Sequence, residues 1–189
     1  MSKQIKVKLR NEIAANKVFK LYFDAIEDKE NNAKEDSYLV IETHSSLEDF
    51  TGVSVLPIVG DSVLLINVYR HAIQKEIFEV PRGFVENDDK NLKSSALREL
   101  REETDFDCKD SNMIFMHGMY PEPGIFRAKI ALFIAKNCFN SNKNILKNKE
   151  FGHKLYKLFS RSDIKKMIQT PEKFDTTTFI LLTHWYQNG

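Results

Sequence analysis

Alternation of apolar and polar residues is the main pattern in the first part of the chain. A two-residue period is typical of half-buried strands and predicts strands over residues 5–9, 18–23 and 38–42. The polar run 27–36, which contains Asn31 and Asn32, is predicted to be a turn or loop. We therefore expect residues 1–48 to form an N-terminal strand region.

Two longer apolar runs rich in β-branched residues follow, over residues 52–58 and 62–69. Gly60-Asp61 between them is a strong two-residue hairpin signal. Similar runs predict further strands over residues 76–80, 113–119, 130–135 and 154–159. Pro81-Arg82-Gly83 is predicted to break the strand before it and to open a polar loop.

A helical period of apolar residues predicts three helices. The first covers residues 91–104, and the last covers residues 176–186. Between them, Ser162-Asp163 is predicted to cap a helix containing Ile164, and Pro171 separates it from the last one. The sum predicts a mixed sheet with helices packed on it, an α/β or α+β domain over residues 49–189 behind the N-terminal strands.

Composition narrows the class of protein. The 189 residues are 42% hydrophobic and 29% charged, which is ordinary for a soluble globular protein with one sizeable core. A formal net charge of +1 gives no global basic field for nucleic acid, although the stretch 140–149, predicted to be a loop, is locally basic. We expect no nucleic-acid partner.

The two cysteines and the N-terminal residues indicate the expected cellular compartment. Cys108 and Cys138 are too few for a disulfide framework and lack zinc-site spacing, so buried or free thiols are expected. The N-terminal residues lack the apolar run of a signal peptide, and no 18-residue apolar segment occurs. We expect a cytoplasmic protein with no membrane partner.

Three glutamates gather on the helix predicted over residues 91–104. At about 100° of rotation per residue, Glu99, Glu102 and Glu103 share one side of the helix. Hard cations such as magnesium prefer carboxylate oxygens and fill their remaining positions with water and substrate phosphate. This pattern favours a metal site and a phosphate substrate, whereas the alternative is a solvated face with an Arg98–Glu102 surface pair.

The segment from Gly83 to Phe106 resembles the signature of Nudix hydrolases, G-x5-E-x7-R-E-U-x-E-E-x-G-U, where U is apolar. The matching residues are Gly83, Arg98, Glu99, Leu100, Glu102, Glu103 and Phe106. The loop before the helix is one residue longer than the pattern, and Asp89 or Lys90 falls at the isolated glutamate, with Asp89 the better substitute. Asp105 replaces the last glycine and can still end the helix in a left-handed conformation.

Flanking segments resemble the ADP-ribose pyrophosphatase branch of that family. Val68-Tyr69-Arg70 and Glu79-Val80-Pro81-Arg82-Gly83 are similar to its Q-Y-R and E-L-P-A-G segments, and Asp175-Thr176-Thr177-Thr178 to the start of its last helix. The resemblance implies a Nudix-like α/β/α sandwich over residues 49–189. It also implies that the strands of residues 1–48 serve as a dimerisation element of a homodimer.

The resemblance also implies residue roles. Glu99 and Glu103 are expected as metal ligands, with Glu102 as a third ligand or as the group that orients metal-bound water. The carbonyl of Arg82 matches a position that completes the metal shell. Arg98 and Gly83 are structural parts of the motif, and Asp89 is expected to stand in for its missing glutamate. The residues expected to bind substrate are Arg70, Glu79 and the side chain of Arg82.

The loop from Tyr120 to Gly124 resembles the P-S-P-G segment of the same branch. A catalytic glutamate often follows that glycine by about four residues, but Ala128 stands there in this chain. Either Glu122 or a glutamate of the helix must therefore act as the base, or the substrate differs from ADP-ribose.

The expected activity is a pyrophosphatase that uses Mg²⁺, with Mn²⁺ as a substitute. It would cleave the diphosphate of ADP-ribose or another nucleotide sugar to a nucleoside monophosphate and a sugar phosphate. Two alternatives remain from the sequence. One is hydrolysis of dinucleoside polyphosphates or nucleoside triphosphates, and the other is a weakly catalytic sensor that binds a nucleotide sugar.

Overall fold

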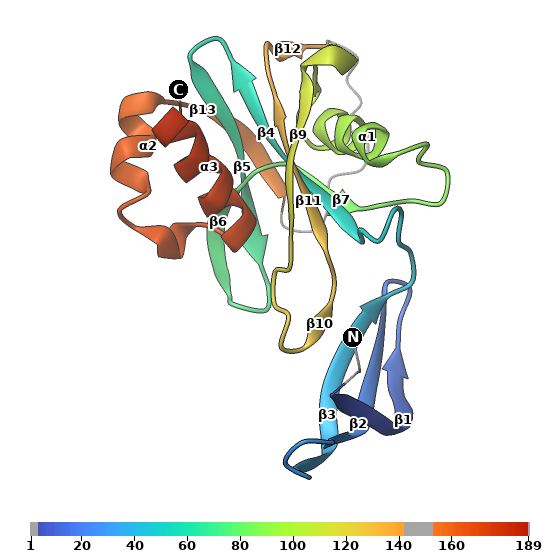
Figure 1. Cartoon of the computed structure of the whole chain (residues 1–189). Coiled ribbons are helices and arrows are strands. Elements are labelled where there is room, and N and C mark those ends of the chain that lie inside the picture. The colour runs from blue at the N-terminus through green and yellow to red at the C-terminus, as the bar shows by residue number, and fades with distance from the viewer. Residues whose placement is uncertain (1–3, 142–152, 189) are drawn as a thin grey trace.

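The computed structural model describes residues 4–141 and 153–188. Within these residues, a seven-stranded mixed sheet has the order β13-β5-β4-β11-β9, with β6 paired to β5 and β7 paired to β4 (Figure 1). Its strands are β4 (Gly52–Val59), β5 (Ser62–Arg70), β6 (Lys75–Glu79), β7 (Arg82–Phe84), β9 (Met113–Met119), β11 (Ile130–Ala135) and β13 (His153–Ser160). Within this sheet the described strands pair in antiparallel fashion except β4 and β11, which are parallel.

Helices cover both faces of this sheet. Helix α1 (Leu92–Thr104) lies on one face, while α2 (Arg161–Met167) and α3 (Thr176–Asn188) lie on the other (Figure 1). Alternate residues of β5 pack against the helices on the two faces of the sheet. Leu64 shares a buried cluster with Leu100 of α1, and Leu65 shares one with Leu181 of α3. The predicted α/β/α sandwich is confirmed.

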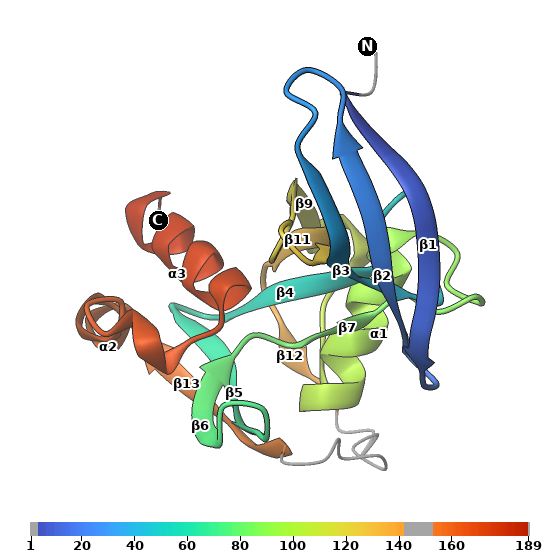
Figure 2. The same cartoon turned by 90° about the horizontal axis from the view of Figure 1, so that it is seen from below.

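The N-terminal strands form a separate antiparallel meander. It consists of β1 (Ile5–Ala15), β2 (Phe19–Asp28) and β3 (Lys34–Thr43), and the short strand β10 (Phe126–Arg127) pairs with β3 in parallel. Figure 2 shows this sheet standing beside the sandwich. The hydroxyl of Tyr38 in β3 donates a 2.5 Å hydrogen bond to the carbonyl of Gly124. This contact joins the meander to the loop between β9 and β11.

Most predicted strands and helices are confirmed to within a few residues, but four predictions need correction. The turn predicted over 27–36 is shorter and covers only residues 29–33, because β2 continues to Asp28 and β3 begins at Lys34. The strand before Pro81 does end, at Glu79, but the polar loop does not open there, since Arg82–Phe84 first forms β7 on β4. Ser160, not Ser162, caps α2, with Asp163 completing the capping box.

The fourth correction concerns the basic stretch 140–149. Asn140 belongs to β12 (Phe139–Asn140), which pairs with β8 (Phe106–Asp107), and residues 142–149 lie outside the described residues. The 3₁₀ turns Asp110–Asn112 and Pro171–Lys173 complete the secondary structure. No helix in the described ranges is long and apolar enough to cross a membrane.

Local sequence fixes both ends of α1. Asn91 caps its N-terminus by accepting a 2.9 Å hydrogen bond from the backbone N–H of Ser94, whose hydroxyl accepts one from the N–H of Asn91. At the other end Asp105 is left-handed, with φ of 61°, and its N–H donates to the carbonyl of Arg101. The helix that carries the three glutamates is thus defined by its own residues.

Candidate active site

Glu99 and Glu103 lie one turn apart on α1 and face strand β7. They are 7% and 8% exposed. The backbone N–H of Arg82 donates a 2.9 Å hydrogen bond to Oε2 of Glu103. The next residue, Gly83, lies against Glu99 so closely that an added Cβ would be 2.6 Å from its Oε2. Consecutive residues of one strand therefore hold the two carboxylates.

Glu102 differs from Glu99 and Glu103 in its exposure to solvent. Its side chain is 51% exposed, and Oε2 accepts a 3.2 Å hydrogen bond from Arg98. Within residues 4–141 and 153–188, no three His, Cys, Asp or Glu side chains lie close enough together to hold a metal ion. The structure therefore gathers Glu99 and Glu103, but not Glu102, against β7.

The donor set at this place nevertheless suits a hard divalent cation. Two buried carboxylates pack against β7 through Gly83, whose lack of a Cβ makes room for Glu99. Magnesium is commonly held by one or two carboxylates, with water and substrate phosphate in its other positions. Glu99 and Glu103 would supply those two ligands.

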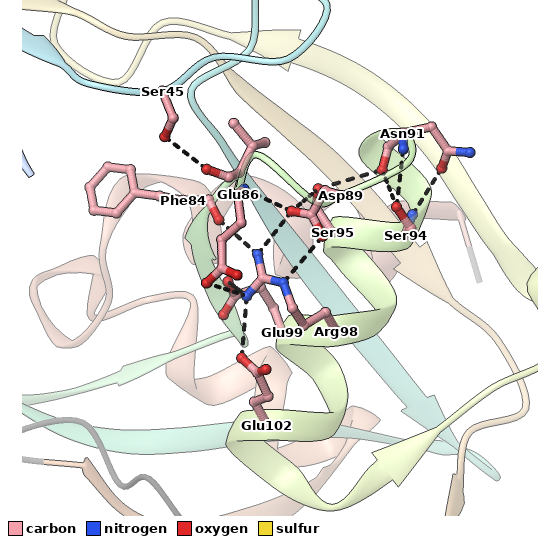
Figure 3. Close-up of polar contacts among 11 residues, drawn as sticks. Ser45, Phe84, Glu86, Asp89, Asn91, Ser94, Ser95, Arg98, Glu99 and Glu102 are labelled. Atoms are coloured by element: carbon pink, nitrogen blue, oxygen red, sulfur yellow. Dashed lines mark hydrogen bonds and ion pairs between the residues drawn. The ribbon is translucent and has the colours of Figure 1, made fainter.

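Arg98 lies midway along α1 and contacts groups of the helix, the preceding loop and β7 (Figure 3). Its guanidinium donates to Glu99 at 2.7 Å, to Asp89 at 3.0 Å and to the carbonyl of Phe84 at 2.9 Å. Burial opposes the charge, but these carboxylates together raise the pKa of Arg98 above its usual value. Arg98 thus joins the loop, β7 and a candidate metal ligand.

Asp89 holds the lengthened loop to the helix. Its carboxylate accepts hydrogen bonds from Arg98, from the hydroxyl of Ser95 at 2.7 Å and from the backbone N–H of Glu86 at 2.8 Å. Burial raises the pKa of Asp89, yet these donors outweigh it and leave the pKa below its usual value. The structure places Asp89, not the exposed Lys90, against the motif arginine.

A second charged cluster lies beside the first. Glu79 is fully buried and accepts two hydrogen bonds from Arg70, at 2.6 and 2.5 Å, and one from Nε of Arg82 at 2.7 Å. Nη1 of Arg82 reaches Asp175 at 3.2 Å. The side chains of Arg70 and Arg82 are about one-third exposed, at 32% and 34%, so each has an accessible edge.

The loop residues Glu122 and Ala128 lie apart from these clusters in the chain. Glu122 is exposed, and its Oε1 is 3.4 Å from the place of a Cβ on Gly124 in the same loop. Ala128 is buried, at 6% exposure, and lines a cavity of about 730 Å³ between this loop and β3. The described contacts do not join Glu122 to Glu99 or Glu103.

The sequence did not indicate Asp175 as a partner of Arg82. Its carboxylate accepts hydrogen bonds from the backbone N–H groups of Thr177 and Thr178, so it caps α3 while it also binds Arg82. An aspartate before a helix is a recognisable cap signal, but its second partner lies 93 residues away in sequence. Only the fold reveals that contact.

Comparison with known families identifies the domain in which these residues lie. The NUDIX domain model matches residues 49–177, well over half of the chain. The match includes α1, β7 and the loop between them. The chain belongs to the NUDIX domain family.

Two individual proteins are similar to this chain, one over part of its length and one at low sequence identity. A methanol dehydrogenase activator from Bacillus methanolicus is 32% identical over 85 residues, which cover 44% of this chain and 44% of the relative. The match therefore spans less than half the length of that protein. A crystal structure of an ADP compounds hydrolase superposes with a TM-score of 0.74 at 16% identity, covering 98% of this chain and 95% of the other. This likeness extends the shared fold to the N-terminal strands.

Proposed function

We propose that this protein is a magnesium-dependent pyrophosphatase that cleaves a nucleoside diphosphate linked to another moiety, with ADP-ribose or another nucleotide sugar as substrate. The products would be a nucleoside monophosphate and a sugar phosphate. The observation that carries the proposal is the pair of buried carboxylates, Glu99 and Glu103, held against β7 by Gly83 and the N–H of Arg82. The likeness to an ADP compounds hydrolase supports the same substrate class.

Magnesium, with manganese as a substitute, would neutralise diphosphate oxygens and activate a water molecule. Glu99 and Glu103 would hold the ion, and Arg98 would keep the Glu99 carboxylate in place through its 2.7 Å hydrogen bond. The carbonyl of Arg82 is proposed as a further ligand. Glu102, which is exposed on the same helix, would orient the attacking water.

Arg70 and Arg82 are proposed to bind the diphosphate. Glu79 lies between their guanidinium groups and fixes both of them, because its two oxygens accept three hydrogen bonds. A planar guanidinium with a fixed orientation is well suited to a phosphate group. Glu79 would thus act through the two arginines rather than on the substrate itself.

The Arg70–Arg82 pair also favours a second candidate function. Two guanidinium groups around one carboxylate suit substrates with more phosphates, such as dinucleoside polyphosphates or nucleoside triphosphates. A panel of substrates decides between these classes.

The N-terminal strand region, residues 1–48, is proposed to form a homodimer. Strand β1 exposes a row of large apolar side chains, Ile5, Val7, Leu9 and Ile13, each at least 45% exposed. Such a row on an edge strand marks a surface for association. A soluble assembly of two chains in sedimentation equilibrium is the expected result.

Product analysis tests the enzymatic proposal. ADP-ribose, ADP- and GDP-sugars, dinucleoside polyphosphates and nucleoside triphosphates are incubated with the protein and Mg²⁺, and monophosphate release is measured by chromatography. We expect release that requires Mg²⁺ and disappears in Glu99→Gln. Tight binding of a nucleotide sugar without release would identify a sensor instead, and wild-type turnover by Glu99→Gln would overturn the proposed site.

A further inference from the structure

The two cysteines of the chain face each other at the end of α1. Strands β8 and β12 pair with Asp107 opposite Phe139 and Phe106 opposite Asn140. Continuing this antiparallel register by one residue places Cys108 opposite Cys138. Residues opposite each other in such a ladder have Cα atoms about 4.5–5.5 Å apart, within the range that a disulfide spans.

Both thiols lie in the core layer between the sheet and α1. Cys108 is 4% and Cys138 6% exposed, and both belong to the buried cluster that contains Leu100. The backbone N–H of Cys138 donates to the carbonyl of Ile58 at 2.8 Å, which fixes that residue. The thiols are therefore held together by the fold and are largely shielded from solvent.

The two sulfur atoms differ in character. The thiol of Cys138 donates a hydrogen bond to the carbonyl of Ala135 at 3.2 Å. The adjacent Cys138 side chain lowers the pKa of the Cys108 thiol, whereas contact with Cys108, together with burial, raises the pKa of Cys138. The thiolate is the reactive form of cysteine. Cys108 is therefore the nucleophile of the pair, and Cys138 is the partner that follows.

We propose that Cys108 and Cys138 form an oxidation site that closes to an intramolecular disulfide with hydrogen peroxide as the oxidant. The Cys108 thiolate attacks one peroxide oxygen, the O–O bond breaks, and hydroxide leaves and takes up a proton to give water and a sulfenic acid. The sulfur of Cys138 then attacks Cys108, loses its proton and expels a second water. Two thiols are oxidised by two electrons, and one peroxide becomes two waters.

The disulfide would restrain the C-terminal end of α1, the helix that carries the glutamates. Cys108 follows α1 by four residues, and the N–H of Ser141, just beyond β12, donates to the carbonyl of the helix cap Asp105 at 2.8 Å. The disulfide would add a covalent link to this contact and close a loop of roughly 30 residues. We expect it to stabilise the fold.

Peptide mapping of the wild-type protein tests the site without any need for activity. After treatment with peroxide under native conditions, we expect both thiols to be lost together and a Cys108–Cys138 peptide to be found before reduction. The thermal midpoint should rise by about 5–10 °C and return with dithiothreitol. Independent oxidation of either cysteine to a sulfinic acid, or two thiols that stay titratable, would overturn the proposal.

Matched variants separate the disulfide from other effects of peroxide. Cys108→Ser and Cys138→Ser each leave one thiol, so neither should form the linked peptide or show the rise in midpoint. A rise in either variant would show that the shift has another cause. If a variant does not fold, the wild-type mapping still decides the question.

Discussion

The backbone N–H of Arg82 donates a 2.9 Å hydrogen bond to Oε2 of Glu103. The same residue sends its side chain to Glu79 and Asp175. A single position of β7 therefore connects the proposed metal ligand with the proposed phosphate-binding arginines. The strand and the helix must keep their relative placement for the site to work.

Gly83 provides the first test of that placement. We expect Gly83→Ala to lower kcat/KM by about a hundredfold or more, because the new Cβ would lie 2.6 Å from Oε2 of Glu99 and displace its carboxylate. The loss should be accompanied by weaker Mg²⁺ activation. Steady-state kinetics at several magnesium concentrations measure both effects.

Gly124→Ala is the matched control. Its new Cβ would be 3.4 Å from the Glu122 carboxylate, close to ordinary contact, so activity should change little. Equal losses in both variants would contradict the special role of Gly83.

Glu79→Gln tests the buried carboxylate between the arginines. Gln has one oxygen in place of two and carries no charge, so Arg70 and Arg82 lose their shared anchor. We expect KM for the diphosphate substrate to rise roughly tenfold, and the free energy of unfolding to fall by about 1–3 kcal/mol. Kinetics and urea denaturation of the same preparation measure these changes.

Glu76→Gln on the same strand is the control, because Glu76 is exposed whereas Glu79 is fully buried. It should leave KM unchanged. A Glu79→Gln enzyme with wild-type KM would show that the arginines bind no substrate.

Asp89→Asn tests the loop contact and its dependence on pH. The folded state lowers the pKa of Asp89, so the ionised carboxylate contributes stability at pH values above its unfolded pKa. That contribution is lost as pH falls through the lower, folded value. We expect the variant to be about 1–3 kcal/mol less stable than wild type at both pH 7 and pH 5, with a smaller difference near pH 3.

Urea denaturation at the three pH values checks this, with Asp88→Asn, at an exposed neighbouring position, as the control. A difference that already disappears at pH 5 would show that Asp89 is not held ionised by Arg98 and Ser95.

The identity of the base gives a fourth prediction. Glu102 is on α1 beside the candidate ligands, whereas Glu122 folds back on its own loop. We therefore expect Glu102→Gln to lower kcat by at least about a hundredfold and Glu122→Gln by less than tenfold. The reverse order in single-turnover assays would assign the base to Glu122.

The elements with strong local signals could be predicted from the sequence. The period of α1 and the hairpin turn at Gly60-Asp61 depend on neighbouring residues, so they needed no tertiary information. The short strands β7 and β10 were missed because two or three residues carry no detectable period. They exist because a distant strand offers free hydrogen-bonding groups.

The candidate site also combines features that local spacing predicts with contacts that only the fold creates. Spacing along one helix predicted that Glu99 and Glu103 share a face, but it also placed Glu102 with them, and the structure leaves that side chain half exposed. The joint binding of Arg70 and Arg82 to Glu79 depends on the pairing of β5 with β6 and on the path into β7. No spacing rule encodes such contacts.

The most direct test of the account is the binding of Mn²⁺, followed by electron paramagnetic resonance, to the wild type and to the double variant Glu99→Gln/Glu103→Gln. We predict that the wild type binds the ion, that the folded double variant does not, and that hydrolysis of the diphosphate is lost with it. Unchanged Mn²⁺ binding in the double variant would contradict the assignment of these two carboxylates as the metal site.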